Sequence, residues 1–252
     1  LVPMAIIILQ HAPHCGPGRI GSCLRDHGFA LDIRRLDLPA DHPAQRGKLL
    51  GVPKDLDNVH GVISLGGPMN VGDATPWMAD EIAFLKKAHD AQLPIVGVCL
   101  GHQLLAHALG GQVGPMDKPE LGFHMVTLNP GGQTETLLGG VPWNSPQYQS
   151  HGQEVKQLPP GAQLLGSSKA CKNQVFKAGL RSYGFQFHFE CDQAMIAELE
   201  KCDTGVTEWA RKSEAPKGLD PAASLEMFNR TADRLCVNIA AFMFPIKAKL
   251  SA

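Results

Sequence analysis

The sequence has no apolar run that approaches eighteen residues, the length that a membrane-spanning helix needs. Its first residues also lack a basic segment followed by an apolar stretch and a cleavage site. We therefore expect no membrane partner and no export signal, and we place the chain in the cytoplasm. The seven cysteines are scattered without paired spacing, which in that compartment favours reduced thiols over a disulfide framework.

An excess of either charge is also missing. The 252 residues include 23 Lys and Arg against 24 Asp and Glu, a formal net charge of −1. This balance gives no electrostatic reason to expect nucleic acid or a lipid surface as a partner. Hydrophobic residues make up 44% of the chain and charged residues 19%, which is typical of a globular protein with a substantial core. The sequence contains no P-loop, internal repeat or low-complexity segment.

The segment that organises the chain reads Gly97-Val-Cys-Leu-Gly-His-Gln103. The apolar run over residues 95–98 predicts a buried parallel strand, and apolar residues at helical spacing over 104–109 predict a helix that ends at Gly110-Gly111. Cys99 therefore stands at a strand-to-helix turn, with one glycine two residues before it and another two residues after it. These small neighbours leave room for a tight turn that pushes the cysteine side chain beyond the carboxyl end of the sheet.

Such a position suits a nucleophile. The positive end of the helix favours the thiolate of Cys99, and the free amides that begin at Leu100 can hold an oxyanion. The alternative is a buried structural cysteine at the end of a core strand, which is a common use of a free cysteine. The flanking glycines on a strand-to-helix turn favour the nucleophile.

The segment Tyr183-Gly-Phe-Gln-Phe-His-Phe-Glu190 predicts the partners of this nucleophile. Polar and aromatic residues alternate there as they do in a strand, so His188 and Glu190 are expected on the same side. A carboxylate beside an imidazole fixes its tautomer and stabilises the imidazolium. Either residue alone would indicate a solvent-facing edge strand, but together with Cys99 they predict a catalytic Cys-His-Glu set.

With these two motifs the chain resembles the class I glutamine amidotransferases over roughly residues 4–192. Members of that family use a Cys-His-Glu triad to release ammonia from glutamine. The resemblance therefore implies Cys99 as nucleophile, His188 as general base and acid, and Glu190 as the orienting carboxylate. The family usually has proline between the histidine and the glutamate. This chain has Phe189 there, a departure that bears on the placement of Glu190.

The resemblance also implies the groups around the nucleophile. Gly67, in a Gly-Gly-Pro turn, would supply one oxyanion amide beside that of Leu100. Gln103 and the pair Ser150 and His151 would contact bound glutamine. His151 is also the alternative base, and we rank it lower because no carboxylate stands beside it on a strand.

Two other patterns have less support. Residues 16–21 contain a G-x-G-x-x-G, the fingerprint of a dinucleotide fold, but six residues separate it from the strand predicted over 4–9, and Pro17 stiffens the turn. We expect a turn and a helix start there, and no cofactor. Cys99 and His102 form a Cys-x-x-His pair, but no second pair completes a four-ligand set, so we predict no metal.

We expect a single α/β domain over residues 1–252, a flavodoxin-like and mostly parallel sheet with helices on both faces. A polar segment over 148–152 is interpreted as turn-like, and residues 39–58 as a loop with a short helical piece. A helical extension of the domain is predicted over about 192–252. The further strands are predicted over residues 29–36, 59–65, 122–128, 163–166, 173–177 and 180–187, and the further helices over 80–91, 194–201, 206–212 and 221–244.

The function implied is hydrolysis of the glutamine side-chain amide through a thioester, with release of glutamate and ammonia. Family members usually pass the ammonia to a synthetase domain. No such domain is found in this sequence, so we expect the acceptor chemistry on a synthetase partner protein, or none. The chain most resembles the free-standing amidotransferase-like proteins, which include γ-glutamyl peptidases, so hydrolysis of γ-glutamyl peptides or conjugates is the alternative. A non-enzymatic or chaperone-like use of the fold, with the cysteine as a redox sensor, is disfavoured because a sensor has no need of the His188 and Glu190 pair.

Overall fold

The computed structural model describes residues 4–39, 41–45, 51–202, 206–212 and 217–244. The strands in these residues are β1 (Ala5–Gln10), β2 (Leu31–Arg35), β3 (Val59–Ser64), β4 (Ile95–Val98), β5 (Gln112–Leu128), β6 (Asn144–Gln157), β7 (Gln163–Ser167), β8 (Val175–Ala178) and β9 (Ser182–Phe185). The helices are α1 (Gly18–Asp26), α2 (Met78–Asp90), α3 (Leu100–Ala108), α4 (Pro130–Thr134), α5 (Gln193–Lys201), α6 (Val206–Lys212) and α7 (Pro221–Asn238). Short helical turns occur at η1 (Pro43–Gln45), η2 (Thr136–Leu138) and η3 (Ile239–Met243).

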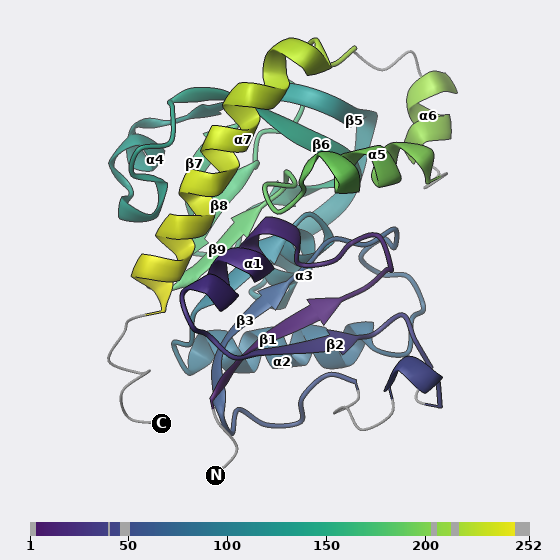
Figure 1. Cartoon of the computed structure of the whole chain (residues 1–252), viewed down its shortest axis with the longest axis vertical. Coiled ribbons are helices and arrows are strands. Elements are labelled where there is room, and N and C mark those ends of the chain that lie inside the picture. Colours follow the sequence, from purple (N-terminus) through teal and green to yellow (C-terminus); the bar gives the residue numbers. More distant parts are fainter. Residues whose placement is uncertain (1–3, 40, 46–50, 203–205, 213–216, 245–252) are drawn as a thin grey trace.

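The described strands form one sheet in the order β2-β1-β3-β4-β9-β8-β7-β5-β6 (Figure 1). The first five strands of this order are parallel, and their arrangement is the one found in flavodoxin-like folds. The pairings from β9 to β6 are antiparallel. The predicted α/β class is confirmed, and the sheet is mixed, with its parallel part forming the flavodoxin-like half.

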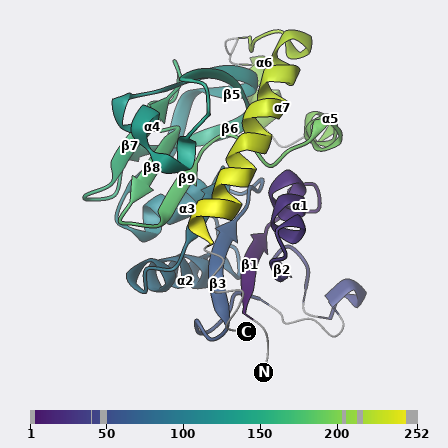
Figure 2. The same cartoon turned by 60° about the vertical axis from the view of Figure 1, so that its left-hand side comes forward.

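Helices cover both faces of the parallel half, which explains why its inner strands β1, β3 and β4 are largely apolar. In β1, Ile6 and Ile8 pack into the core that α1 and α7 share, whereas Ile7 and Leu9 pack into the core of α2 and α3. Because alternate residues of a strand point to opposite faces, a strand covered on both sides must be apolar at each position. Figure 2 shows α1 and α2 on opposite sides of β1 and β3.

The antiparallel half differs from the prediction in two places. Residues 148–152, expected to be turn-like, lie in the middle of β6, where Tyr148 to His151 pair with β5. The polar sequence was misleading because Gln149 and His151 are buried among polar partners instead of facing solvent. The strand predicted over 180–187 ends at Phe185, so the residues that follow it form bends and turns.

The helices predicted after residue 192 are α5, α6 and α7, and α7 continues into η3. Phe228 and Leu235 of α7 belong to the same apolar core as β1 and α1. Residues 203–205, 213–216 and 245–252 of this predicted extension, and residues 40 and 46–50 of the predicted loop, lie outside the described residues.

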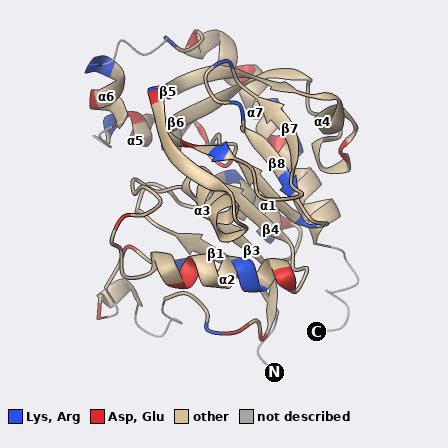
Figure 3. Cartoon of the chain, turned by 180° about the vertical axis from the view of Figure 1, so that it is seen from behind, with Lys and Arg blue, Asp and Glu red and all other residues tan. Residues whose placement is uncertain are grey.

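Charge and hydrophobicity of the described helices agree with the balanced composition. Seen from behind in Figure 3, acidic and basic residues alternate along α2. Its first turn contains Asp80 and its last turn Lys87. In the part of the chain that the structure describes, no helix combines the length and the apolar character that crossing a membrane requires.

The contact between α3 and β3 makes a stability prediction. A Cβ added at Gly101 would lie 2.1 Å from the Ser64 carbonyl oxygen, a backbone atom that cannot move aside freely. We expect Gly101→Ala to lower the free energy of unfolding by about 1–3 kcal/mol, although alanine favours a helix by about 1 kcal/mol over glycine. Chemical denaturation measures this change.

Gly114→Ala is the matched control, since its added Cβ would meet only the flexible Lys156 side chain, at 3.5 Å. We expect that variant to remain as stable as the parent. Equal stability of Gly101→Ala and Gly114→Ala would contradict the close approach of α3 to β3.

Candidate active site

Cys99 joins β4 directly to α3 and has a strained backbone. Its φ of 51° and ψ of −105° lie in a region that non-glycine residues rarely occupy. The Cys99 N–H donates to the Phe185 carbonyl at 2.8 Å, and the Gly101 N–H donates to the Leu65 carbonyl at 3.1 Å. A Cβ on Gly97 would lie 2.5 Å from the Gly101 carbonyl oxygen, so the two glycines make the turn possible. The strand-to-helix turn predicted from the sequence is present.

A pocket with an accessible volume of about 50 Å³ opens at this turn. It brings together seven of the eight residues that the sequence singled out, namely Gly67, Cys99, Leu100, Gln103, Ser150, His151 and His188. The eighth, Glu190, lies behind His188 and is 1% exposed. As the first residue of α3, Leu100 has an N–H with no partner inside the helix, at the edge of this pocket.

His188 and Glu190 are in contact. Nδ1 of His188 donates to Oε1 of Glu190 at 2.8 Å, and both side chains are buried. They reach this contact from a turn, not from the strand that we predicted. Polar and aromatic side chains still alternate there as in a strand, because the backbone is held in place. The Gln186 and His188 amides donate to the backbone carbonyls of Gln174 and Tyr148.

The replacement of the family's proline by Phe189 leaves this contact intact. Phe189 is fully buried and packs edge-on against Phe185, with the ring centroids 5.1 Å apart. Phe187 packs against Phe185 in the same way at 5.8 Å. The aromatic side chains thus occupy the core side of the turn, and His188 and Glu190 are left on the other side.

Electrostatics favour the charged form of His188. Burial lowers its pKa, but the Glu190 carboxylate and Cys99 act more strongly in the other direction and hold the pKa of His188 well above its usual value. Because Nδ1 of His188 is hydrogen-bonded to Glu190, Nε2 is the ring nitrogen that remains to interact with Cys99. The arrangement therefore suits an imidazolium that stabilises a neighbouring thiolate.

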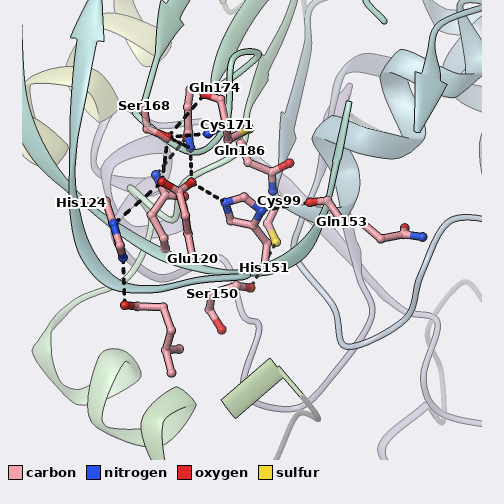
Figure 4. A network of polar contacts seen from close by, with 12 residues as sticks. Cys99, Glu120, His124, Ser150, His151, Gln153, Ser168, Cys171, Gln174 and Gln186 are labelled. Carbon is pink, nitrogen blue, oxygen red and sulfur yellow. Dashed lines mark hydrogen bonds and ion pairs between the residues drawn. The ribbon is translucent and has the colours of Figure 1, made fainter. Parts of the chain in front are cut away.

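The His151 side chain is turned toward a carboxylate that the sequence did not reveal. Its Nε2 lies 3.1 Å from Oε2 of Glu120, and its Nδ1 lies 2.9 Å from the Gln153 carbonyl oxygen (Figure 4). Our reason for ranking His151 below His188, the lack of a carboxylate beside it, was wrong. A better reason replaces it: both ring nitrogens are already engaged, one by Glu120 and the other by the Gln153 carbonyl, so neither is left for Cys99.

Glu120 is the functional candidate that sequence reasoning missed. It is 1% exposed, accepts from Ser168 at 2.7 Å and from Gln174 at 2.8 Å, and contacts His151 (Figure 4). Burial raises its pKa, but the hydrogen bonds and charge of His151 outweigh this, and the pKa of Glu120 lies below its usual value. No local signal marked it, because β5 brings it beside His151 from 31 positions away.

Gln103 and Ser150 lie where the sequence placed them, on the pocket wall. The Gln103 amide nitrogen donates to the Gln153 carbonyl at 2.9 Å and to Oε1 of Gln186 at 3.0 Å, so this side chain holds β6 against α3. The Ser150 carbonyl oxygen lies 3.9 Å from Sγ of Cys99 (Figure 4). Contact of these residues with a substrate stays a prediction.

The G-x-G-x-x-G segment supports the turn that carries Glu190. A Cβ on Gly18 would lie 2.1 Å from the Glu190 carbonyl oxygen, and the Arg19 N–H donates to that oxygen at 2.8 Å. The Arg19 side chain also donates to the Cys191 carbonyl at 3.0 Å and, on α7, to Asn229 at 2.5 Å and Asp233 at 2.9 Å. The helix start that a pyrophosphate would need is thus occupied by the chain itself.

Among the described residues, one group of side chains has metal-ligand geometry. Atoms of His188, Glu190 and Cys191 lie within 4.8 Å of one another. Two of the three already form the His188–Glu190 hydrogen bond, and burial raises the pKa of the Cys191 thiol to about 12. We therefore count His188 and Glu190 of this group as members of the candidate active site. His102 is fully buried against Phe176, and burial lowers its pKa to about 3.

Fold and sequence agree on the class of protein. The sequence profile of "Glutamine amidotransferase class-I" matches residues 19–195. The chain belongs to the class I glutamine amidotransferase family.

Its relatives include synthases. Over 133 residues the chain is 36% identical to a glutamine-hydrolyzing GMP synthase subunit of Thermococcus kodakarensis, covering 52% of this chain and 65% of that protein. It is 33% identical over 140 residues to a glutamine-hydrolyzing GMP synthase of Porphyromonas gingivalis, covering 55% of this chain and 26% of that protein. The chain thus spans about a quarter of the length of the first curated relatives that it matches.

Among solved structures, a glutamine amido transferase from Methylobacillus flagellatus is similar over 98% of this chain and 95% of its own, with a TM-score of 0.81 and 26% identity. A glutamine amidotransferase from Thermotoga maritima has a TM-score of 0.73 at 20% identity over 97% of both chains, a likeness of fold.

The His188–Glu190 contact makes a prediction about pH. Glu190→Gln removes the charge that raises the pKa of His188 and leaves burial, which lowers it, so the pKa of His188 should fall. Histidine-selective NMR titration measures the shift. The loss of the imidazolium with rising pH would then occur at lower pH than in the parent.

Turnover should fall in Glu190→Gln, though less than in His188→Ala.

Glu226→Gln is the control, because this exposed α7 residue forms an ion pair with Arg230 at 2.6 Å. It should leave the His188 titration unchanged. An unchanged titration and full activity in Glu190→Gln would mean that Glu190 does not orient His188.

Proposed function

We propose that the chain hydrolyses the side-chain amide of glutamine with Cys99 as nucleophile, His188 as general base and acid, and Glu190 as the orienting carboxylate. One observation carries this proposal: the strained turn presents Cys99 to a pocket that His188 also lines, and Glu190 is hydrogen-bonded to His188 from behind. A redox sensor would need the cysteine alone, so the pair favours catalysis.

The reaction follows from these positions. The Cys99 thiolate attacks the amide carbon of the glutamine side chain, and the amides of Gly67 and Leu100 hold the oxyanion that forms. The His188 imidazolium gives its proton to the amide nitrogen, the C–N bond breaks, and ammonia leaves a thioester. His188 then takes a proton from water, whose oxygen attacks the thioester. The C–S bond breaks, glutamate leaves and the thiolate returns.

One feature of the pocket supports glutamine over larger γ-glutamyl compounds, and that feature is the wall beside α6. Val206 of α6 lines the pocket, and the neighbouring Trp209 ring packs on Gly152, where an added Cβ would lie 2.6 Å from the ring. Hydrolysis of γ-glutamyl peptides or conjugates, the alternative function, would need this wall to open.

The acceptor of ammonia is a further part of the proposal. Relatives in Thermococcus kodakarensis and Pyrococcus abyssi carry the name of a glutamine-hydrolyzing GMP synthase subunit. By that likeness we propose that this chain delivers ammonia to a synthetase partner protein. We further propose that residues 1–252 form one domain, because α7 shares an apolar core with the strands of the flavodoxin-like half.

Covalent labelling tests the nucleophile. Cys99→Ser should abolish labelling by a diazoketone analogue of glutamine while the far-ultraviolet circular dichroism stays unchanged, because a serine hydroxyl beside the same base rarely matches a thiolate. Cys171→Ser is the control and should label normally, since that thiol is fully buried away from the pocket lining. Labelling mapped to Cys171 or Cys191 would refute the assignment of Cys99.

A substrate panel tests the reaction. The purified chain should release ammonia and glutamate from glutamine, with glutathione and γ-glutamyl amides cleaved more slowly. Trp209→Ala should narrow that gap by admitting larger leaving groups, because the Trp209 ring packs behind Gly152, which lines the pocket. Preference of the parent for γ-glutamyl peptides would favour the peptidase. Inactivity on all of these compounds, relieved by a co-purifying protein, would show that a partner is required.

A further inference from the structure

A second buried histidine lies behind the loop that follows β3. His11 comes directly after β1 and has no exposed surface. Its Nε2 lies 2.8 Å from Oε2 of Glu81 on α2, and its Nδ1 lies 3.2 Å from the Gly66 carbonyl oxygen. The ring stacks on Trp77 with the centroids 4.6 Å apart, and Ser64 donates to the other oxygen of Glu81 at 2.6 Å.

The contacts of this ring define its protonation. Both neighbours of the ring nitrogens are acceptors, so the contacts favour the doubly protonated ring, in which both nitrogens donate. Burial lowers the pKa of His11, but Glu81 and the carbonyls of Leu65 and Gly66 together raise it by more. The pKa of His11 therefore lies above its usual value. Glu81 is the titratable group that faces His11 from α2. The loop after β3 contributes backbone carbonyls, and Trp77 contributes an uncharged ring.

The same loop borders the nucleophile on its opposite side. A Cβ on Gly66 would lie 2.7 Å from Cε1 of His188 and 3.6 Å from Cβ of Cys99. A Cβ on Gly67 would instead meet Cβ of His11 at 2.8 Å. The peptide between the two glycines is therefore enclosed between His11 and the reacting groups.

Peptide geometry connects the two sides. The structure has no cis peptide bond among its described residues, and in a trans peptide the carbonyl and the N–H point in opposite directions. The oxygen of the Gly66–Gly67 peptide is Gly66 O, which His11 binds, and its N–H belongs to Gly67, which lines the pocket. Fixing the oxygen from behind thus fixes the direction of the Gly67 N–H.

We propose that His11 is a positioning residue for glutamine hydrolysis: its Nδ1–H holds the Gly66 carbonyl so that the Gly67 N–H points at the oxyanion. The inference rests on the proposed function and extends it to a residue that never touches substrate. A charged donor on the carbonyl also polarises the peptide, which makes its N–H a stronger donor. Glu81 serves this arrangement by keeping both ring protons in place.

Two substitutions separate the two contacts of the ring. Asparagine places its amide nitrogen near the position of Nδ1, so His11→Asn can still donate to Gly66. Glutamine places its nitrogen near Nε2, so His11→Gln can reach Glu81 but not Gly66. A residue that merely braces β1 against α2 would be harmed by both substitutions alike, whereas a positioning residue is harmed mainly by the second.

Steady-state kinetics on glutamine gives the first readout. We expect His11→Gln to lower kcat by about tenfold or more, less than the full loss of an oxyanion donor, with KM within about twofold. His11→Asn should restore kcat to within about threefold of the parent. His89→Gln, which removes a contact with Ser182 farther along α2, is the control and should change neither constant.

Amide NMR of the ¹⁵N-labelled protein gives the second readout, which does not depend on activity. The Gly67 amide shift should titrate together with the His11 ring in the parent, stay near the parent value without titrating in His11→Asn, and move in His11→Gln.

The outcomes separate the two proposals. A parent chain that hydrolyses no glutamine, either alone or with a co-purifying protein, refutes the proposed function, while the Gly67 shift still decides whether His11 orients the peptide. Equal kcat values in the two His11 variants, or a Gly67 shift that ignores His11, overturn the positioning role.

Discussion

The catalytic edge of this protein depends on the absence of a loop between β4 and α3. A chain that passes straight from strand to helix must place one residue in a strained conformation, and that residue is Cys99. The strain persists because neighbouring backbone leaves no alternative: α3 lies so close to β3 that Gly101 tolerates no side chain. The position of the thiol is thus a property of the whole parallel half, not of a local motif.

Buried histidine–glutamate pairs recur around this constraint and differ in what their second ring nitrogen meets. In His188 one nitrogen is left for Cys99, so the ring can exchange a proton. In His11 and His151 the second nitrogen instead contacts a backbone carbonyl, so both ring nitrogens are engaged in holding the structure. Burying such a pair costs desolvation energy, and only well-placed hydrogen bonds offset that cost. Because a shifted backbone would lose these hydrogen bonds, the pairs hold the backbone around the pocket in one arrangement.

The sequence predicted what local patterns encode. Spacing and glycines were enough to predict the Cys99 turn, the apolar strands of the parallel half, α2 and α3. What escaped prediction depends on pairings distant in sequence. Glu120 meets His151 across the β5–β6 hairpin, and Glu81 meets His11 across 70 positions. Polar residues in β6 resembled a turn because nothing local shows that a partner will bury them.

The four contacts of Arg19 have a consequence for the order in which the site is assembled. Arg19 joins the turn of Glu190 to Asn229 and Asp233 on α7, near the end of the described chain. During synthesis from the amino end, Cys99 and His188 leave the ribosome before α7 does. The turn therefore gains its last support only when residues 221–238 have folded back onto α1. A nascent chain can carry Cys99, His188 and Glu190 and still lack the contacts that hold the turn of Glu190 in place.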